Sequence, residues 1–156
     1  MLASVARPDW RRAPGPVRVA RDMPSALETI DACPLLESLS AKDRQGLAQD
    51  LRERRWEAGE TITSPDSGGI AFFLLAEGTA KVVVGGVEVG TMSPGETFGE
   101  IGLLTGANRT AEVAASTDVQ CWTLSQWNFK PLVLAHPEVA WRMLEKLAQR
   151  VVTQRS

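Results

Sequence analysis

Metal-binding and cross-linking side chains are scarce in this sequence. Among 156 residues there is one histidine, His136, and there are two cysteines, Cys33 and Cys121, which lie far apart and form no CxxC pair. This argues against a zinc site and against a disulfide scaffold, and two isolated thiols are typical of buried cysteines in a reducing cytoplasm. A metal-dependent cupin is a β-barrel of similar size, but it needs several histidine ligands. We therefore expect no metal and no other cofactor.

Long apolar runs and the motifs of common enzymes are also absent. No stretch approaches the ~20 apolar residues that cross a bilayer, and no apolar core follows the arginines near the N-terminus, so neither a membrane span nor a secretory signal is expected. The motifs GxSxG, GxxxxGKS/T and GxGxxG do not occur, and no pair of carboxylates has a context typical of acid–base chemistry. The sequence therefore predicts a cytoplasmic protein that is not an enzyme.

Length and composition are those of one globular domain with a basic extension. The chain is long enough to bury a core, and 44% of its residues are hydrophobic. Residues 1–24 have a net charge of +3 and four prolines, whereas the remainder has a net charge of −5 and does not match the basic face of a nucleic-acid binder. We predict a flexible extension over 1–24 and one domain over 25–156. The alternative for the extension is an arm that contacts nucleic acid or an acidic partner.

Hydrophobic periodicity predicts a helix, then a compact β unit, then two closing helices. Ser40, with Asp43 three residues on, predicts the start of the first helix, which is expected to end near residues 54–56. Ser125 and Pro137 predict the starts of the two closing helices. Short strands are predicted at 70–75, 79–84, 87–89, 110–116 and 118–124, with a tight hairpin at Gly85–Gly86. This order indicates an α+β protein that is mainly β, with a small antiparallel sandwich or barrel between flanking helices.

One stretch, FGEIGLLTGANRTA at residues 98–111, places two charged side chains among small and apolar residues. A helical turn from Glu100 to Leu104, between two strands, would present free backbone N–H groups, and Gly99 would let the backbone approach a ligand closely. The Arg109 guanidinium suits two phosphate oxygens, and the Glu100 carboxylate suits a sugar hydroxyl. A cyclic nucleotide carries one phosphate charge and one free ribose hydroxyl in a rigid ring, so this stretch would match it.

The same residues carry a family resemblance. FGEIGLL followed by NRTA resembles the phosphate-binding cassette of the cyclic nucleotide-binding domains, which occur in catabolite activators, cyclic-nucleotide-dependent kinases and gated channels. The surroundings are similar as well, with a leading helix, Gly59 in an AGE turn, Gly78 in an EG turn and two closing helices, over about residues 30–152. The resemblance implies an antiparallel β-roll or jelly-roll barrel with an N-terminal helix, a short cassette helix and two C-terminal helices.

The resemblance also implies roles for the matched positions. Arg109 would hold the cyclic phosphate, Glu100 the ribose 2′-hydroxyl, and Thr110 would contact the phosphate through its hydroxyl. A Thr at this position is compatible with both cAMP and cGMP, and cAMP is the expected ligand. The ligand-binding positions predicted in this way are Phe98, Gly99, Glu100, Ile101, Gly102, Leu103, Arg109, Thr110 and Ala111.

The apolar residues of the C-terminal helices leave two interpretations open. Trp141 and Leu144 would form a lid over the base in this family, whereas apolar stripes of helices usually pack into the core. Trp122 and Trp127 are predicted in the core or at a hinge. The apolar face of the last helix is predicted to consist of Ala140, Leu144, Leu147, Ala148 and Val151.

The leading functional hypothesis is a stand-alone cyclic nucleotide sensor. The chain stops about one helix after Pro137, so no DNA-binding domain, kinase or channel segment is expected. Its output would then pass to an unidentified protein effector, through self-association as a homodimer, or to a domain on another chain. The alternative is a degenerate domain that keeps the fold, binds no nucleotide and serves as a protein-interaction module, with Glu100 and Arg109 as an ordinary ion pair.

Overall fold

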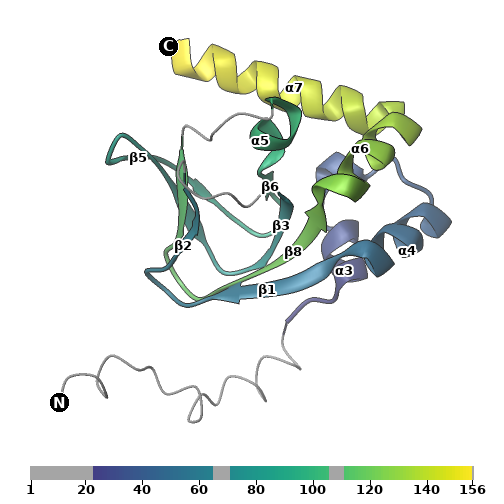
Figure 1. Ribbon diagram of the computed structural model, residues 1–156, viewed down its shortest axis with the longest axis horizontal. Coiled ribbons are helices and arrows are strands. Elements are labelled where there is room, and N and C mark those ends of the chain that lie inside the picture. The colour runs from purple at the N-terminus through teal and green to yellow at the C-terminus, as the bar shows by residue number, and fades with distance from the viewer. Residues whose placement is uncertain (1–22, 65–70, 106–110, 156) are drawn as a thin grey trace.

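The computed structural model describes residues 23–64, 71–105 and 111–155 and shows two antiparallel sheets flanked by helices (Figure 1). One sheet has the strand order β1-β8-β3-β6 and the other β2-β7-β4-β5. The strands are β1 (Arg52–Trp56), β2 (Thr61–Thr63), β3 (Ala71–Glu77), β4 (Ala80–Val84), β5 (Val87–Met92), β6 (Thr97–Phe98), β7 (Glu112–Ala115) and β8 (Val119–Ser125). The predicted β-roll with flanking helices is confirmed.

Capping residues determine where the N-terminal helices begin. In α3 (Ala26–Asp31), Ser25 and Glu28 form a reciprocal capping box, and the η1 turn (Pro34–Leu36) follows. In α4 (Ala41–Asp50), the Ser40 hydroxyl accepts a hydrogen bond from the Asp43 N–H at 3.1 Å. The predicted start of α4 is therefore confirmed.

The predicted end of this helix, near residues 54–56, is wrong. Leu51 already has extended backbone, with a ψ of 148°, and residues 52–56 pair along β8 as strand β1. The sequence of β1, RERRW, is mostly exposed and has no apolar alternation that would reveal a strand. Its conformation is decided by tertiary pairing with a distant strand rather than by local propensity.

The β unit follows the predicted order of strands and turns. The β4–β5 hairpin turns at Gly85 and Gly86, which have φ of 59° and 83°, the left-handed values that a two-residue hairpin requires. Strand β3 is buried on both faces: Phe72 and Leu74 face a core shared with the helices, and Phe73 and Leu75 face the core between the sheets. The apolar run at 70–75 is therefore the central strand on which both cores rest.

Two helices end the chain. Helix α6 (Gln126–Ala135) and helix α7 (Pro137–Arg155) meet at His136, as the Pro137 break predicts. Figure 1 shows α7 running along one side of the molecule, next to the short helix α5 (Glu100–Thr105).

The predicted apolar face of α7 is packed only in part, since Leu147 packs against the helical core but other members of the face do not. Val139 and Met143 are buried against the helical core, whereas Leu144 is 58% and Val151 53% exposed. Apolar residues occur on both sides of α7, so periodicity could not tell the packed side from the exposed one. Trp127 is 78% exposed, so its predicted place in the core is wrong, and its role at a hinge stays a prediction. Trp122 is half-buried, and its indole N–H donates to the Pro24 carbonyl at 3.1 Å.

Candidate functional site

The cassette begins at a close contact between β6 and β3. Phe98 is buried and its ring stacks on Phe73, with centroids 4.7 Å apart. Gly99 follows with a φ of 95°, and a Cβ at this position would lie 2.3 Å from the Ala71 carbonyl oxygen. Only glycine meets both conditions, so the Gly99 that the sequence analysis singled out is required by backbone packing. This junction directs the next residue, Glu100, into the interior at the start of α5.

Glu100 is a buried carboxylate that the described residues leave with few hydrogen bonds. Its side chain is 1% exposed. Oε1 lies 3.4 Å from Nζ of Lys146, and Oε2 lies 3.5 Å from a guanidinium nitrogen of Arg150. Among the described residues, Oε2 accepts no hydrogen bond. A carboxylate removed from water in this way is a strong acceptor for any hydroxyl or N–H that reaches it.

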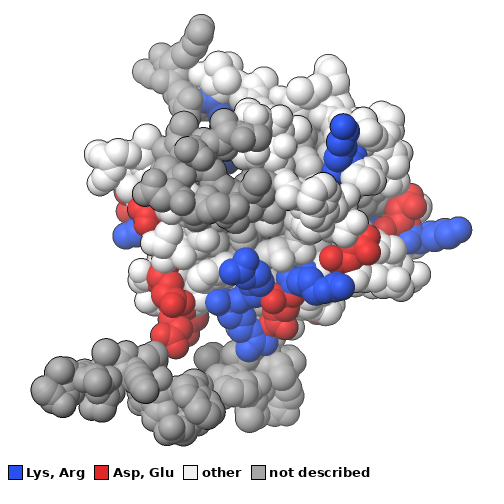
Figure 2. Space-filling view, viewed as in Figure 1, with Lys and Arg blue, Asp and Glu red and all other residues white. Residues whose placement is uncertain are grey.

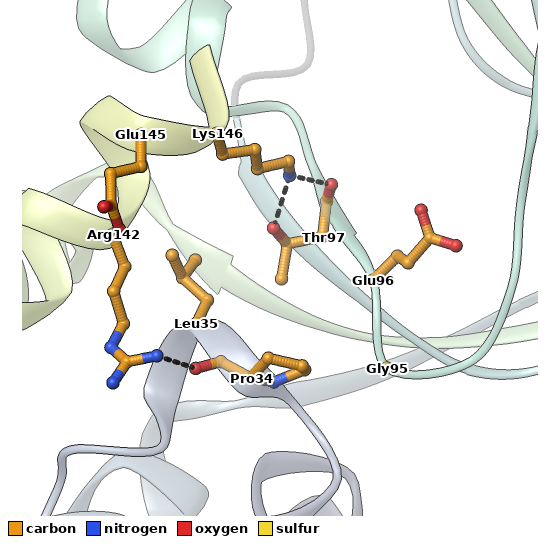
Figure 3. Close-up of a pocket in the computed structure, with 8 residues that line it drawn as sticks. All are labelled: Pro34, Leu35, Gly95, Glu96, Thr97, Arg142, Glu145 and Lys146. Carbon is orange, nitrogen blue, oxygen red and sulfur yellow. Dashed lines mark hydrogen bonds between the residues drawn. The ribbon is translucent and has the colours of Figure 1, made fainter. Parts of the chain in front are cut away.

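Lys146 connects α7 to the cassette. Its ammonium donates to the Thr97 carbonyl oxygen at 2.5 Å and to the Thr97 hydroxyl at 2.7 Å (Figure 3). It also reaches the Glu100 carboxylate at 3.4 Å. Burial lowers the pKa of Lys146 most strongly, the Glu100 carboxylate raises it, and the nearby Arg150 lowers it further. The cationic form is thus held by oxygen ligands from both β6 and α5.

The other predicted positions divide into three groups. Gly102 is buried, Leu103 packs against the helical core and Ala111 is half-buried just before β7, whereas Ile101 is exposed on α5. Arg109 and Thr110 lie outside the described residues, so their predicted phosphate contacts stay predictions.

The two candidate lid residues, Trp141 and Leu144, are 62% and 58% exposed. At 100° per residue they lie on the side of α7 opposite Lys146. Their role as a lid stays a prediction.

Sequence reasoning missed Lys146 and Arg150. They lie 46 and 50 residues after Glu100, so no local motif links them to the cassette. A signal does exist in the helix itself. Lys146 and Arg150 continue the spacing of the buried Val139 and Met143, at intervals of four, three and four residues, and so share their face. Cations on the packed face of a helix predict a buried anionic partner.

A cleft of about 400 Å³ lies between η1, the turn before β6 and α7 (Figure 3). Its lining mixes charges of both signs with apolar groups, and Lys146 contributes to its wall. Glu100 is not among the residues that line it. The lining residues are Pro34, Leu35, Gly95, Glu96, Thr97, Arg142, Glu145 and Lys146.

Other features of the described residues add no reactive site. Cys33 and Cys121 are both buried, and burial raises the pKa of the Cys121 thiol to about 12 and also raises that of Cys33, so neither is a ready nucleophile. No helix in the described ranges combines the length and apolar character needed to cross a bilayer. On the lower half of the face shown in Figure 2, Lys and Arg side chains of the described residues are interspersed with Asp and Glu side chains.

A family model for the cyclic nucleotide-binding domain matches residues 53–136. A cAMP-dependent protein kinase regulatory subunit from Aspergillus niger is 37% identical over 106 residues, which are 67% of this chain and 26% of that protein. The corresponding subunit from Mycosarcoma maydis is 42% identical over 87 residues, covering 53% of this chain and 17% of that protein. The matched part of the chain thus spans between 17% and 26% of the length of these two curated relatives.

Solved structures share the fold. The regulatory domain of Toxoplasma gondii PKA with cAMP superposes with a TM-score of 0.71 at 24% identity, covering 80% of this chain and 49% of that one. The catabolite activator protein of Thermus thermophilus superposes with a TM-score of 0.69 at 27% identity, covering 78% of this chain and 60% of that one.

Proposed function

This chain belongs to the cyclic nucleotide-binding domain family, and we propose that it binds a cyclic nucleotide, cAMP in preference to cGMP, as a regulatory rather than a catalytic module. The observation that carries this proposal is Glu100, a fully buried carboxylate with an oxygen atom that accepts no hydrogen bond from the described residues. A buried oxygen atom without a hydrogen bond destabilises the folded state, and a hydroxyl of the ligand would donate the hydrogen bond that it lacks. The preference for cAMP follows from the curated relatives, which are named as regulatory subunits of cAMP-dependent kinases.

In the proposed binding mode, two side chains bind different groups of the ligand. Glu100 accepts a hydrogen bond from the ribose 2′-hydroxyl, and Arg109 pairs with the cyclic phosphate. The Gly99 junction fixes the direction of Glu100 because the backbone there cannot accept a Cβ without moving away from β3. The ligand would therefore meet a carboxylate whose position is set before binding, which reduces the entropy lost on association.

We propose that ligand binding is communicated to a partner by a change in the position of α7. Glu100 is already within 3.5 Å of two α7 side chains, so a ligand that engages Glu100 acts directly on the contacts that hold this helix. Only a ligand with different affinities for two arrangements of α7 can shift the population between them. A protein effector that recognises α7, or a second copy of the chain, would then sense the ligand.

A second candidate function rests on the same cluster. Glu100 already forms ion pairs with Lys146 and Arg150 of the same domain. This arrangement is compatible with a domain that keeps the fold for protein interaction and binds no nucleotide. Stable capture of a protein partner, with no thermal shift from any cyclic nucleotide, would support this function.

Isothermal titration calorimetry with cAMP and cGMP tests the main proposal on wild type, Glu100→Gln and Arg109→Ala. We expect Arg109→Ala to weaken binding by about 2–5 kcal/mol, as for removing one partner of a desolvated charge pair. Glu100→Gln should cost about 1–3 kcal/mol, since a neutral amide replaces a charged acceptor. Glu88→Gln is the matched control, because Glu88 is exposed on β5. Undiminished binding by both site variants would sink the proposed binding mode.

A further inference from the structure

We propose that residues 1–22 bind intramolecularly to one end of the β-roll, which is formed by the turns at 57–60, 77–79 and 116–118 and which we name the acidic end. This contact would hold the basic segment against the domain and withhold it from nucleic acids and acidic proteins. The inference does not depend on the proposed binding of a cyclic nucleotide. Residues 1–22 lie outside the described residues, whereas all three turns are described.

The acidic end carries four carboxylates and no lysine or arginine. Hydrogen bonds join its turns to one another. The Asp118 carboxylate accepts a hydrogen bond from the Ala58 N–H at 3.0 Å, and the Thr117 hydroxyl accepts one from the Thr79 N–H at 3.0 Å. Within the described part of the chain, none of the four carboxylates forms an ion pair. They are those of Glu57, Glu60, Glu77 and Asp118.

The nearest cations belong to β1 and already have partners. Arg55 pairs with the Glu53 carboxylate, and the Arg54 guanidinium lies over the Trp56 ring, 5.1 Å from its centroid. Arg54 can offset one of the four negative charges, so the acidic end keeps a net negative charge. Figure 1 shows β1, which leads into the first of the three turns, on the side of the molecule opposite α7.

The point at which residues 1–22 leave the domain lies close to this end. The Trp122 indole N–H donates to the Pro24 carbonyl at 3.1 Å, which holds Pro24 on β8. Asp118 lies four residues before Trp122, a distance of about 13 Å along the strand. Arg21 and Arg18 are three and six residues from Pro24, so an extended chain brings both within reach. Because the segment is tethered, its effective concentration at the acidic end is high.

Gln120 provides a second, independent observation. It is 1% exposed, and its Oε1 accepts no hydrogen bond from the described residues, while its Nε2 donates to the Glu53 carboxylate at 3.1 Å. Gln120 pairs in register with Glu77 and, two residues from Trp122, lies on the same face of the sheet. A buried oxygen without a hydrogen bond is destabilising. An N–H of the segment, on its way from Pro24 to the acidic end, would donate the hydrogen bond that this oxygen lacks.

The charge of the segment is opposite to that of the acidic end. Residues 1–22 have five arginines and two aspartates, a net charge of +3. Guanidinium groups form charge-assisted hydrogen bonds with carboxylates. A single exposed ion pair contributes little, so the contact would depend on several pairs acting together with the tether. The arginines are Arg7, Arg11, Arg12, Arg18 and Arg21.

Tryptic cleavage after these arginines, followed by mass spectrometry on the full chain, tests the contact. The test variant is Glu57→Gln/Glu77→Gln, since Glu60 and Asp118 also accept hydrogen bonds within the turns. At about 20 mM salt, where charges are weakly screened, this variant should be cleaved roughly fivefold faster than wild type. At about 300 mM salt the two rates should become equal, because screening weakens the contact in wild type.

The matched control is Glu88→Gln/Glu145→Gln, which removes two carboxylates from exposed positions of β5 and α7. It should be cleaved at the wild-type rate at both salt concentrations. Gln120→Met removes the Oε1 acceptor and should speed cleavage about twofold, whereas Gln49→Met, at an exposed position of α4, should not change it. Urea unfolding shows whether each variant is folded under the conditions of cleavage.

Heparin, a polyanion, measures whether the contact withholds the arginines. At about 20 mM salt, Glu57→Gln/Glu77→Gln should bind heparin roughly fivefold more tightly than Glu88→Gln/Glu145→Gln, although the two variants have the same net charge. Equal affinities would overturn the inference.

The remaining outcomes separate this inference from the alternatives. Equal cleavage rates for the two double variants at low salt would overturn it. Protection from trypsin that increases with protein concentration would show that the segment binds a second copy of the chain, and would overturn the intramolecular contact. Absence of cAMP binding by wild type would overturn the proposed function but not this inference.

Discussion

Replacing Gly99 by alanine measures how tightly the start of the cassette packs on β3. Gly99 has a φ of 95°, a conformation that costs a residue with a Cβ about 1–2 kcal/mol. The Cβ would also lie 2.3 Å from the Ala71 carbonyl oxygen and 3.0 Å from Cδ1 of Phe73. Because the oxygen belongs to the backbone of β3, the strand or the cassette must move, at a further cost of about 1–3 kcal/mol. We expect the free energy of unfolding to fall by about 2–5 kcal/mol.

Two other glycines separate these two costs. Gly59 has nearly the same φ, 93°, but no neighbouring atom of the described residues lies within 4 Å of the place its Cβ would take. Gly59→Ala should therefore cost only the conformational part, about 1–2 kcal/mol. Gly46 lies inside α4, where a Cβ has free space, so Gly46→Ala should stabilise the protein by roughly 0.5–1 kcal/mol.

Urea unfolding followed by tryptophan fluorescence gives the three free energies on one scale. Calorimetry with cAMP, under conditions where each variant is folded, then separates an effect on the cassette from an effect on the whole domain. Gly99→Ala should weaken cAMP binding more than Gly59→Ala does, since Glu100 directly follows the displaced backbone. Equal losses of stability for Gly99→Ala and Gly59→Ala would refute the close contact between the cassette and β3.

Two further predictions concern capping and alkaline pH. Ser40→Ala should lower the free energy of unfolding, measured in urea, by about 1 kcal/mol because the Ser40 hydroxyl caps α4. Ser125→Ala should lower it much less, because the Ser125 side chain makes no capping hydrogen bond to α6. Similar losses for both variants would count against the capping explanation. Burial raises the pKa of Cys121 from 9.0 to about 12, so the unfolded chain releases this proton first and stability falls as the pH rises above 9. The stability difference between wild type and Cys121→Ala should accordingly shrink by up to about 1.4 kcal/mol per pH unit above pH 9, and a constant difference would show that the thiol is not protected.

The fold was predictable where local chemistry decided the structure. Gly85–Gly86 forms its hairpin and Pro137 begins its helix because backbone conformation at these positions depends on the residues themselves. Strand β1 was not predictable, since its exposed RERRW sequence becomes a strand only by pairing with β8, whose residues lie more than 60 positions away. The candidate site divides in the same way. The cassette was visible in the contiguous residues from Phe98 to Ala111, but Lys146 and Arg150 join it only through the packing of α7.

The two faces of α7 connect the site to a partner in the proposed mechanism. The inner face carries Lys146 and Arg150 onto Glu100, and the outer face exposes Trp141, Leu144 and Val151. A helix of 19 residues moves largely as one body, so a shift that alters the inner contacts also reorients the outer apolar side chains. The cations that contact Glu100 and the surface that a partner would recognise are therefore parts of one element. Variants of Lys146 should consequently change both cAMP affinity and partner binding, and paired measurements of the two affinities would check this.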